Sequence, residues 1–159
     1  MFAFRPIEIS SDWDKLVAFH RDTFCLSYGS DEKFSEPAYR EIMRDRLETF
    51  PQGQMMVLDG AAVAGQVELA IRECQGRRFG YVSLFYLAPA WRGQGLGREL
   101  TDFAETCFAA HGLDEYRLRV AAMNEQAVRF YERQGFEQVG CERGERLVWI
   151  MRKGLPRSR

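Results

Sequence analysis

Residues 92–97 read Arg-Gly-Gln-Gly-Leu-Gly, and this short run carries the clearest chemistry in the sequence. It lies between a strand-like apolar segment, residues 81–87, and a segment with helical periodicity, residues 98–110. Glycines at a strand-to-helix junction let the main chain approach a ligand closely. The free N–H groups of the first helical turn then face that ligand with the positive end of the helix dipole behind them. The spacing favours a phosphate or pyrophosphate site over an ordinary glycine-rich turn.

Two common nucleotide-binding patterns do not match this run. The Walker pattern needs a lysine directly after its last glycine, and none stands there. The dinucleotide pattern Gly-x-Gly-x-x-Gly fails because its third glycine would fall on Arg98 or Leu100. The run also lies past the middle of the chain, not after an N-terminal first strand as in a Rossmann fold. Both nucleotide-binding folds are therefore disfavoured.

The same residues carry a family resemblance. Arg92-x-x-Gly95-x-Gly97 resembles the Arg/Gln-x-x-Gly-x-Gly/Ala signature of the GNAT superfamily of N-acetyltransferases. A second block resembles the family segment Asn-x-x-Ala-x-x-Phe-Tyr-x-x-x-Gly-Phe, here formed by Asn124, Ala127, Phe130, Tyr131, Gly135 and Phe136. The two blocks stand in the family's order and spacing across about residues 79–140. The resemblance implies acetyl-CoA as the cosubstrate and an amine as the acceptor.

The patterns along the chain predict an α/β (α+β) fold. We expect a mixed, mostly antiparallel sheet of six or seven strands flanked by four helices, of the acyl-CoA N-acyltransferase type. Strands are expected at residues 2–9, 55–58, 63–71, 79–87, 116–122, 136–141 and 146–152. Helices are expected after a capping box at residues 11–14, from residue 37 to residue 50, at 98–110 and at 124–134. One domain should cover residues 1–153, with a frayed tail at 154–159.

Composition sets limits on the function. A net charge of −1 gives no case for nucleic-acid binding. The four cysteines stand far apart without a Cys-x-x-Cys pair, which argues against a zinc site and against a disulfide framework. The first 25 residues show no signal peptide, and no apolar run is long enough to span a membrane. We therefore expect a cytoplasmic enzyme without a metal, and the resemblance is compatible with a homodimer.

The resemblance maps the cosubstrate site onto main-chain groups. It implies that Phe85 and Leu87 hold the pantetheine arm through their backbone, with the N–H of Leu87 as donor to the oxyanion. It implies that the pyrophosphate is bound by the amides of Arg92, Gly93, Gly95, Leu96, Gly97 and Arg98. Asn124 is expected to cap its helix, and either this capping role alone or an additional contact to the pantetheine arm fits the sequence.

Tyr131 stands where the family places the acid that meets the leaving thiolate. A phenol with a pKa of about 10 does not hand over its proton outright, so we expect it to stabilise the thiolate by a hydrogen bond first. The alternative is a packed aromatic side chain on the inner face of a helix.

The base is harder to assign. An alkylammonium with a pKa of about 10.4 is almost fully protonated at pH 7, so catalysis needs a route for its proton. Some family members use a glutamate early in the strand before the glycine run, where this chain has Tyr81. Glu68, inside an otherwise apolar strand, is the best replacement. A solvated role for Glu68, with a chain of waters removing the proton instead, stays open.

The acceptor is expected to meet the first two helices and the loop between them. That region contains acids beside aromatics, which suit a cationic amine through charge and cation–π contact: Tyr28, Asp31, Glu32, Glu36 and Tyr39. A solvated connecting loop is the alternative. Three functions stay open: an acetyltransferase for a small cationic amine, one for a protein N-terminus or lysine, and a non-catalytic acyl-CoA sensor.

Overall fold

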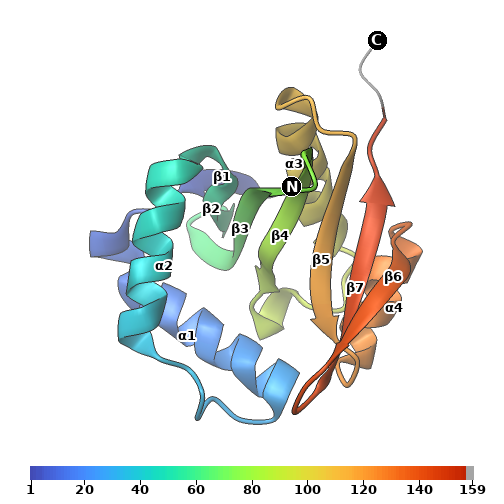
Figure 1. Ribbon diagram of the computed structural model, residues 1–159. Helices are drawn as coiled ribbons and strands as arrows, with labels where there is room; N and C mark the ends of the chain where they lie inside the picture. The colour runs from blue at the N-terminus through green and yellow to red at the C-terminus, as the bar shows by residue number, and fades with distance from the viewer. Residues whose placement is uncertain (157–159) are drawn as a thin grey trace.

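The computed structural model describes residues 1–156 and shows one seven-stranded sheet with two α-helices against each face (Figure 1). The mixed sheet and the four helices confirm the predicted fold class. No helix within this range is both long enough and apolar enough to cross a membrane. In chain order the elements are β1 (Ala3–Pro6), α1 (Ile9–Tyr28), α2 (Glu36–Thr49), the 3-10 turn η1 (Pro51–Gly53), β2 (Gln54–Asp59), β3 (Ala62–Cys74), β4 (Arg77–Leu87), the 3-10 turn η2 (Pro89–Trp91), α3 (Gly97–Ala110), β5 (Glu115–Ala121), α4 (Glu125–Arg133), β6 (Glu137–Arg143) and β7 (Leu147–Gly154).

The strand order is β1-β2-β3-β4-β5-β7-β6, and every neighbouring pair is antiparallel except β4 and β5. The parallel pair is joined only over Gly80–Val82 and Tyr116–Leu118. Beyond these residues the two strands diverge, as the lower half of Figure 1 shows. The divergence leaves part of β4 without a neighbour on one side, and it positions the site described below.

Two apolar cores hold the layers together. One core packs α3 and α4 on the sheet through residues such as Leu100, Phe108 and Val128. The other packs α1 and α2 on the opposite face through residues such as Leu16 and Met43. Fully burying side chains of this size contributes about 1.5–3 kcal/mol each, so both helix layers are fixed to the sheet by burial.

The N-terminus differs from the sequence prediction. The first strand covers only Ala3–Pro6, and α1 already begins at Ile9. The predicted capping box at residues 11–14 is wrong, because the N-cap residue is Glu8 and its side chain makes no capping bond. Asp12 satisfies this helix end instead: its carboxylate accepts the N–H of Glu8 at 2.8 Å and pairs with Arg5.

The C-terminal boundary also shifts. Strand β7 continues to Gly154, and the side chain of Leu155 is buried in the α3-side core. The N–H of Leu155 donates to the main-chain oxygen of Asp114 at 2.7 Å. Ordered structure therefore reaches two residues into the predicted tail at 154–159, while the domain boundary itself stays a prediction. Residues 157–159 of that tail lie outside the described residues.

Candidate active site

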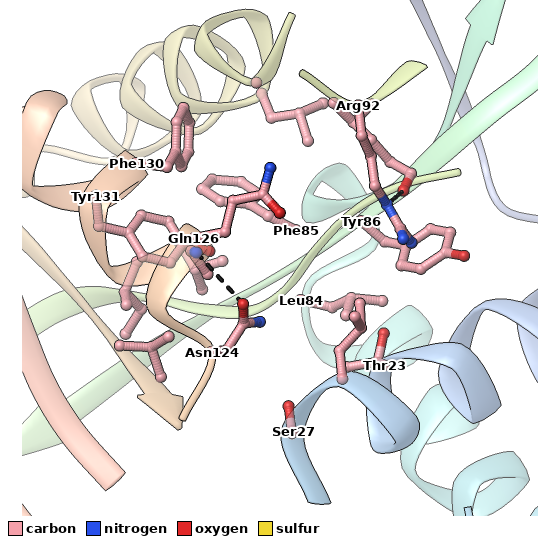
Figure 2. A pocket seen from close by; sticks show the side chains of 18 of the residues that line it. Thr23, Ser27, Leu84, Phe85, Tyr86, Arg92, Asn124, Gln126, Phe130 and Tyr131 are labelled. Carbon is pink, nitrogen blue, oxygen red and sulfur yellow. Dashed lines mark hydrogen bonds between the residues drawn. The ribbon is translucent and has the colours of Figure 1, made fainter. Parts of the chain in front are cut away.

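The divergence of β4 and β5 opens a cavity of about 450 Å³ in the middle of the molecule. Its walls come from the C-terminal half of α1, the second half of β4, the glycine run with the start of α3, the end of β5 and the first turns of α4. Figure 2 shows Phe85, Phe130 and Tyr131 toward one end of this cavity and Thr23 and Ser27 of α1 toward the other.

Strand β4 presents main-chain groups to the cavity. The N–H of Ala88 donates to the oxygen of Ala64 at 2.8 Å, and the same register pairs Leu87 with Gly65. Hydrogen-bonding direction alternates along an antiparallel pair, so the main-chain groups of Leu87 and Phe85 point away from β3. They point to the side where β5 has diverged. Both predicted pantetheine contacts therefore line the cavity with backbone groups free of the sheet.

The glycine run forms the loop between η2 and α3. Gly93 and Gly95 have φ angles of 72° and 75°, a conformation that glycine adopts without strain. Within the described chain, none of the amide N–H groups from residue 93 to residue 98 donates to another main-chain group. A row of free N–H groups at a helix N-terminus is an anion site by its chemistry. This is the environment that the sequence predicted for a pyrophosphate.

Two members of the predicted pyrophosphate set depart from that role. The N–H of Arg92 donates to the oxygen of Pro89 at 3.2 Å, so it is not among the free amides. The prediction for this amide is corrected. Arg98 does not line the cavity, and only its unpaired N–H in the first turn of α3 remains available. Gly93, Gly95, Leu96 and Gly97 all line the cavity, and their binding of a pyrophosphate stays a prediction.

The side chain of Arg92 binds protein groups on two other elements, β4 and α1. Its Nε donates to the main-chain oxygen of Leu87 at 2.8 Å, and its NH2 group pairs with Asp22 of α1 at 2.6 Å. Asp22 also accepts the hydroxyl of Tyr86. Burial alone would raise the pKa of Asp22, but the hydrogen bonds from Tyr86 and Arg92 outweigh burial and lower it. Asp22 is thus an anion that ties α1 to the end of β4.

Tyr131 and Asn124 lie on α4 at the edge of the cavity (Figure 2). Burial raises the pKa of Tyr131 above that of an ordinary phenol, so its hydroxyl keeps its proton at neutral pH. Asn124 is the N-cap of α4, and its Oδ1 accepts the N–H of Ala127 at 3.3 Å. The capping role is confirmed. The amide also lines the cavity, so both roles left open by the sequence are compatible with its position.

Glu68 is not where a base would have to be. Its side chain is fully buried between β3 and the first two helices, and it does not line the cavity. Its oxygens are occupied by Arg46, the hydroxyl of Tyr39 and the amide of Gln66. The structure therefore places Glu68 away from the cavity, which gives its assignment as catalytic base no support, and the solvated alternative is wrong because the side chain is buried. The strand alternation was read correctly, but α2 covers that face of β3.

The five predicted acceptor-binding residues do not meet at the cavity either, since none of them lines it. Tyr39 is only 4% exposed and packs against Trp13, whose indole N–H donates to Glu36. Asp31 pairs with Arg21 at the surface, and Glu32 is exposed. The ring of Tyr28 lies under the guanidinium of Arg146. The α1–α2 loop faces the β6–β7 turn instead of the cavity.

The sequence analysis missed the residues that line the end of the cavity opposite the glycine run. These are Thr23, Leu26 and Ser27 on α1, with Arg119 and Ala121 on β5. A usable signal was present, because Leu16, Phe19 and Thr23 follow one another at helical spacing and continue the buried face of α1 toward Ser27. No comparable sequence pattern indicated that Arg119 and Ala121 of β5 would line the cavity.

The charge around the cavity is one-sided. Among residues 1–156, the charged side chains in its lining are Arg92, Arg119 and Arg133, and no carboxylate or imidazole contributes. The described part of the chain also holds no group of three or more His, Cys, Asp or Glu side chains placed to bind a metal ion. His20 on α1 is mostly buried and lies beside Glu68, and this burial lowers its pKa.

Comparison with known proteins places this geometry in a family. The family model described as an acetyltransferase (GNAT) domain matches residues 17–152. The mycothiol acetyltransferase of Propionibacterium freudenreichii subsp. shermanii is 28% identical over 134 residues, which cover 84% of this chain but 42% of that protein. N-alpha-acetyltransferase 30 of Schizosaccharomyces pombe is 29% identical over 103 residues, covering 64% of this chain and 69% of that protein. The chain thus spans less than half the length of the first of these relatives.

Solved structures share the fold at lower identity. Naa20 of Chaetomium thermophilum in complex with a bisubstrate analogue superimposes with a TM-score of 0.77 at 18% identity, covering 96% of this chain and 86% of that one. Spermidine N-acetyltransferase of Vibrio cholerae in complex with CoA and spermine gives a TM-score of 0.72 at 20% identity, covering 96% and 95%. Because the family model spans most of the sequence and the fold agrees with it, the chain belongs to the GNAT family of acetyltransferases.

Proposed function

We propose that this protein is an N-acetyltransferase that moves an acetyl group from acetyl-CoA to a primary amine by direct attack in a ternary complex. The observation that carries the proposal is the arrangement of free main-chain N–H groups around one cavity. Gly93, Gly95, Leu96 and Gly97 line one end with free amides that would bind the anion, and Phe85 and Leu87 line the middle with backbone groups turned away from β3.

The cavity offers complementary groups along the length of such a cosubstrate. The amides of Gly93, Gly95 and Gly97 would hold the diphosphate, where the dipole of α3 adds positive potential. A Cβ at Gly93 or Gly95 would meet nothing within 4 Å, so space above the loop is open for phosphate oxygens. The main-chain groups of Phe85 and the N–H of Leu87 suit the amides of a pantetheine arm, while the oxygen of Leu87 already accepts from Arg92. The residues present therefore fit acetyl-CoA.

At the reacting end, the N–H of Leu87 would donate to the oxygen that becomes negative when the amine attacks the thioester. The bond from Arg92 to the main-chain oxygen of Leu87, which belongs to the next peptide group, helps to hold this end of β4 in place. A preset donor of this kind contributes about 2.7–4 kcal/mol to catalysis in enzymes where it has been removed. Tyr131, kept protonated by burial, would donate to the departing thiolate.

The acceptor would enter from the opposite end, between Thr23 and Ser27 of α1 and Ala121 of β5. Arg146 links the two sides of this region, because its guanidinium bonds to the main-chain oxygen of Tyr28 and lies 2.7 Å from the sulfur of Met123. A bridged opening favours a narrow acceptor over a lysine on a folded protein surface. A small amine, cationic in solution, is the first candidate.

A peptide N-terminus is the second candidate, and the specific observation in its favour is the similarity to N-alpha-acetyltransferase 30. The side chains that suggested a cationic ligand do not line the cavity, so charge no longer separates the two candidates. A cytoplasmic location and a homodimer stay predictions. Light scattering on the purified protein checks the second of these.

Release of the CoA thiol from acetyl-CoA tests the function. The purified protein would be assayed with spermidine, with tyramine and with a hexapeptide that has a free α-amine. Turnover with an amine supports the proposal, and the best acceptor separates the two candidates. Thermal stabilisation by acetyl-CoA without turnover on any acceptor would instead indicate an acyl-CoA sensor. The variant Gly95→Glu should abolish the stabilisation, because a carboxylate would occupy the anion site.

A further inference from the structure

A second cavity of about 490 Å³ lies between α2 and the sheet. Its α2 wall includes Glu41 and Asp45, both exposed to solvent, and its β3 wall includes Ala70. The two cavities have one lining residue in common, Ser83 of β4. Ser83 therefore lies between the candidate active site and a solvent-exposed recess on the other side of the strand.

The strand geometry explains this placement. Glu68 pairs with Leu84 and Leu69 pairs with Val82, so Ser83 is the extra residue of a β-bulge. The bulge is located where β4 loses its pairing with β5, directly after Val82. A β-bulge changes the direction in which a side chain points, and here that side chain is the hydroxyl-bearing Ser83.

The hydroxyl oxygen of Ser83 is buried and has no hydrogen-bond partner within residues 1–156. A buried hydroxyl without a partner is destabilising relative to a hydrogen-bonded one. Such a group is retained at that cost where a ligand or water completes its bonds. Ser83 thus has one free donor and free lone pairs at the boundary of two cavities.

The other candidates for removing the acceptor proton are already occupied. Within the described chain, the first cavity has no carboxylate or imidazole in its lining. Glu68 is bonded to Arg46, Tyr39 and Gln66. Asp22 is held as an anion by Tyr86 and Arg92.

Resting on the proposed function, we infer that Ser83 is the proton relay of the reaction. Its oxygen accepts a proton from the acceptor nitrogen while its own hydroxyl proton passes to water in the second cavity. The serine is regenerated in the same step, and the proton leaves to solvent past Glu41 and Asp45. The relay needs no ionised side-chain base, which is consistent with a cavity whose charged lining residues are all arginines.

Several charged or titratable groups lie on the elements around Ser83, and they frame the expected pH behaviour. They are Glu68 and Arg72 on β3, Glu41, Asp45 and Arg46 on α2, Tyr81 on β4 and Arg119 on β5. Most of them have partners: Arg46 bonds Glu68, Arg72 lies over Tyr81, and Arg119 pairs with Glu142. The second cavity is therefore the remaining route by which the proton can reach solvent.

The test compares Ser83→Ala with Ser83→Thr, using the amine that the wild type acetylates best. The alanine variant should lower kcat about 100-fold, as expected when acid–base assistance is lost. Its pH–rate profile should move to higher pH, and its defect should shrink where the amine is neutral without help. The threonine variant keeps a hydroxyl and should restore the wild-type profile. Acetyl-CoA affinity, measured by calorimetry, should stay unchanged and shows that each variant is folded.

Two further variants separate a relay from a structural role. Ser30→Ala removes an exposed hydroxyl that lines neither cavity and should leave the pH profile where it is. Ala70→Leu fills the second cavity without touching the first and should lower kcat while acetyl-CoA affinity is retained. A wild-type pH profile in Ser83→Ala overturns the relay and leaves the proposed function intact. No turnover by the wild type on any amine overturns the proposed function and the relay together.

Discussion

The guanidinium of Arg92 donates to the main-chain oxygen of Leu87 at 2.8 Å, so the arginine of the glycine run secures the strand end that precedes it. The same side chain reaches Asp22 on α1 and lies 5.3 Å from the ring centre of Tyr86. Arg92 thus links three walls of the cavity: the glycine loop that contains it, β4 and α1. Because Arg92 also pairs with Asp22, the position of the end of β4 at Leu87 depends on a residue far away in sequence.

Asp22→Asn should lower kcat/KM about tenfold, because a charged hydrogen bond contributes about 1.5–3 kcal/mol and tenfold corresponds to about 1.4 kcal/mol. The loss should appear mainly in kcat, since Asp22 holds Arg92 and Tyr86 and does not itself line the cavity. Steady-state kinetics with calorimetric acetyl-CoA affinity checks this. Asp114→Asn, at an exposed pair with Arg77, is the control. Equal kinetics in the two variants would contradict the coupling.

Tyr131→Phe should lower kcat by about 10²-fold with little change in acetyl-CoA affinity, because only the departing thiolate needs the hydroxyl. Tyr116→Phe serves as the matched control, since its hydroxyl donates to Glu105 inside the fold and not in the cavity. That variant should lose stability and keep turnover. Unchanged turnover in Tyr131→Phe would remove this tyrosine from the mechanism.

Gly97→Ala should weaken acetyl-CoA binding while the protein stays folded. A Cβ at this position would lie 2.8 Å from the ring of Phe130, so that ring or the first turn of α3 must shift, and both line the cavity. Calorimetry measures the affinity and circular dichroism the fold. Gly144→Ala, where a Cβ would meet nothing within 4 Å, should bind like the wild type. Wild-type affinity in Gly97→Ala would show that the turn does not contact the ligand.

Glu68→Gln should lower the free energy of unfolding by about 3–5 kcal/mol, because Arg46 would be left without its buried partner. Turnover per folded molecule should be unchanged, since Glu68 does not line the cavity. Urea unfolding and the thiol assay measure the two effects. Glu73→Gln, at the exposed end of the same strand, is the control. A loss of turnover at unchanged stability would restore Glu68 as a base.

Asp12 should contribute a pH-dependent part of the stability. Burial raises its pKa, but the hydrogen bonds from Arg5 and from the N–H of Glu8 outweigh burial and lower it. A carboxylate with a depressed folded-state pKa stabilises the fold above the unfolded pKa of about 3.9 and loses this effect as pH falls through the folded value. The Tm difference between wild type and Asp12→Asn should therefore be full at pH 7 and shrink below about pH 4. Asp14→Asn, exposed on the same helix, should show no such dependence.

Local patterns were enough to predict much of the fold. The helical periodicity of α3 and the capping role of Asn124 depend on residues close together in sequence, and the structure confirms them. The start of α1 was missed for a local reason too. The side chain that caps it, Asp12, lies inside the helix and also binds Arg5, a partner that the capping-box pattern does not contain.

From the sequence by itself, the glycine run and the second motif block determined the family and predicted an anion site, because main-chain amides at a strand-to-helix junction need only local geometry. The tertiary structure alone decided which side chains face the reacting atoms. Packing of α2 over β3 buried Glu68 and Tyr39, and the divergence of β5 from β4 brought Ser27, Ser83 and Ala121 to one cavity. Whether a strand residue faces solvent, a core or a cavity depends on what covers it, and that is set by contacts between segments distant in sequence.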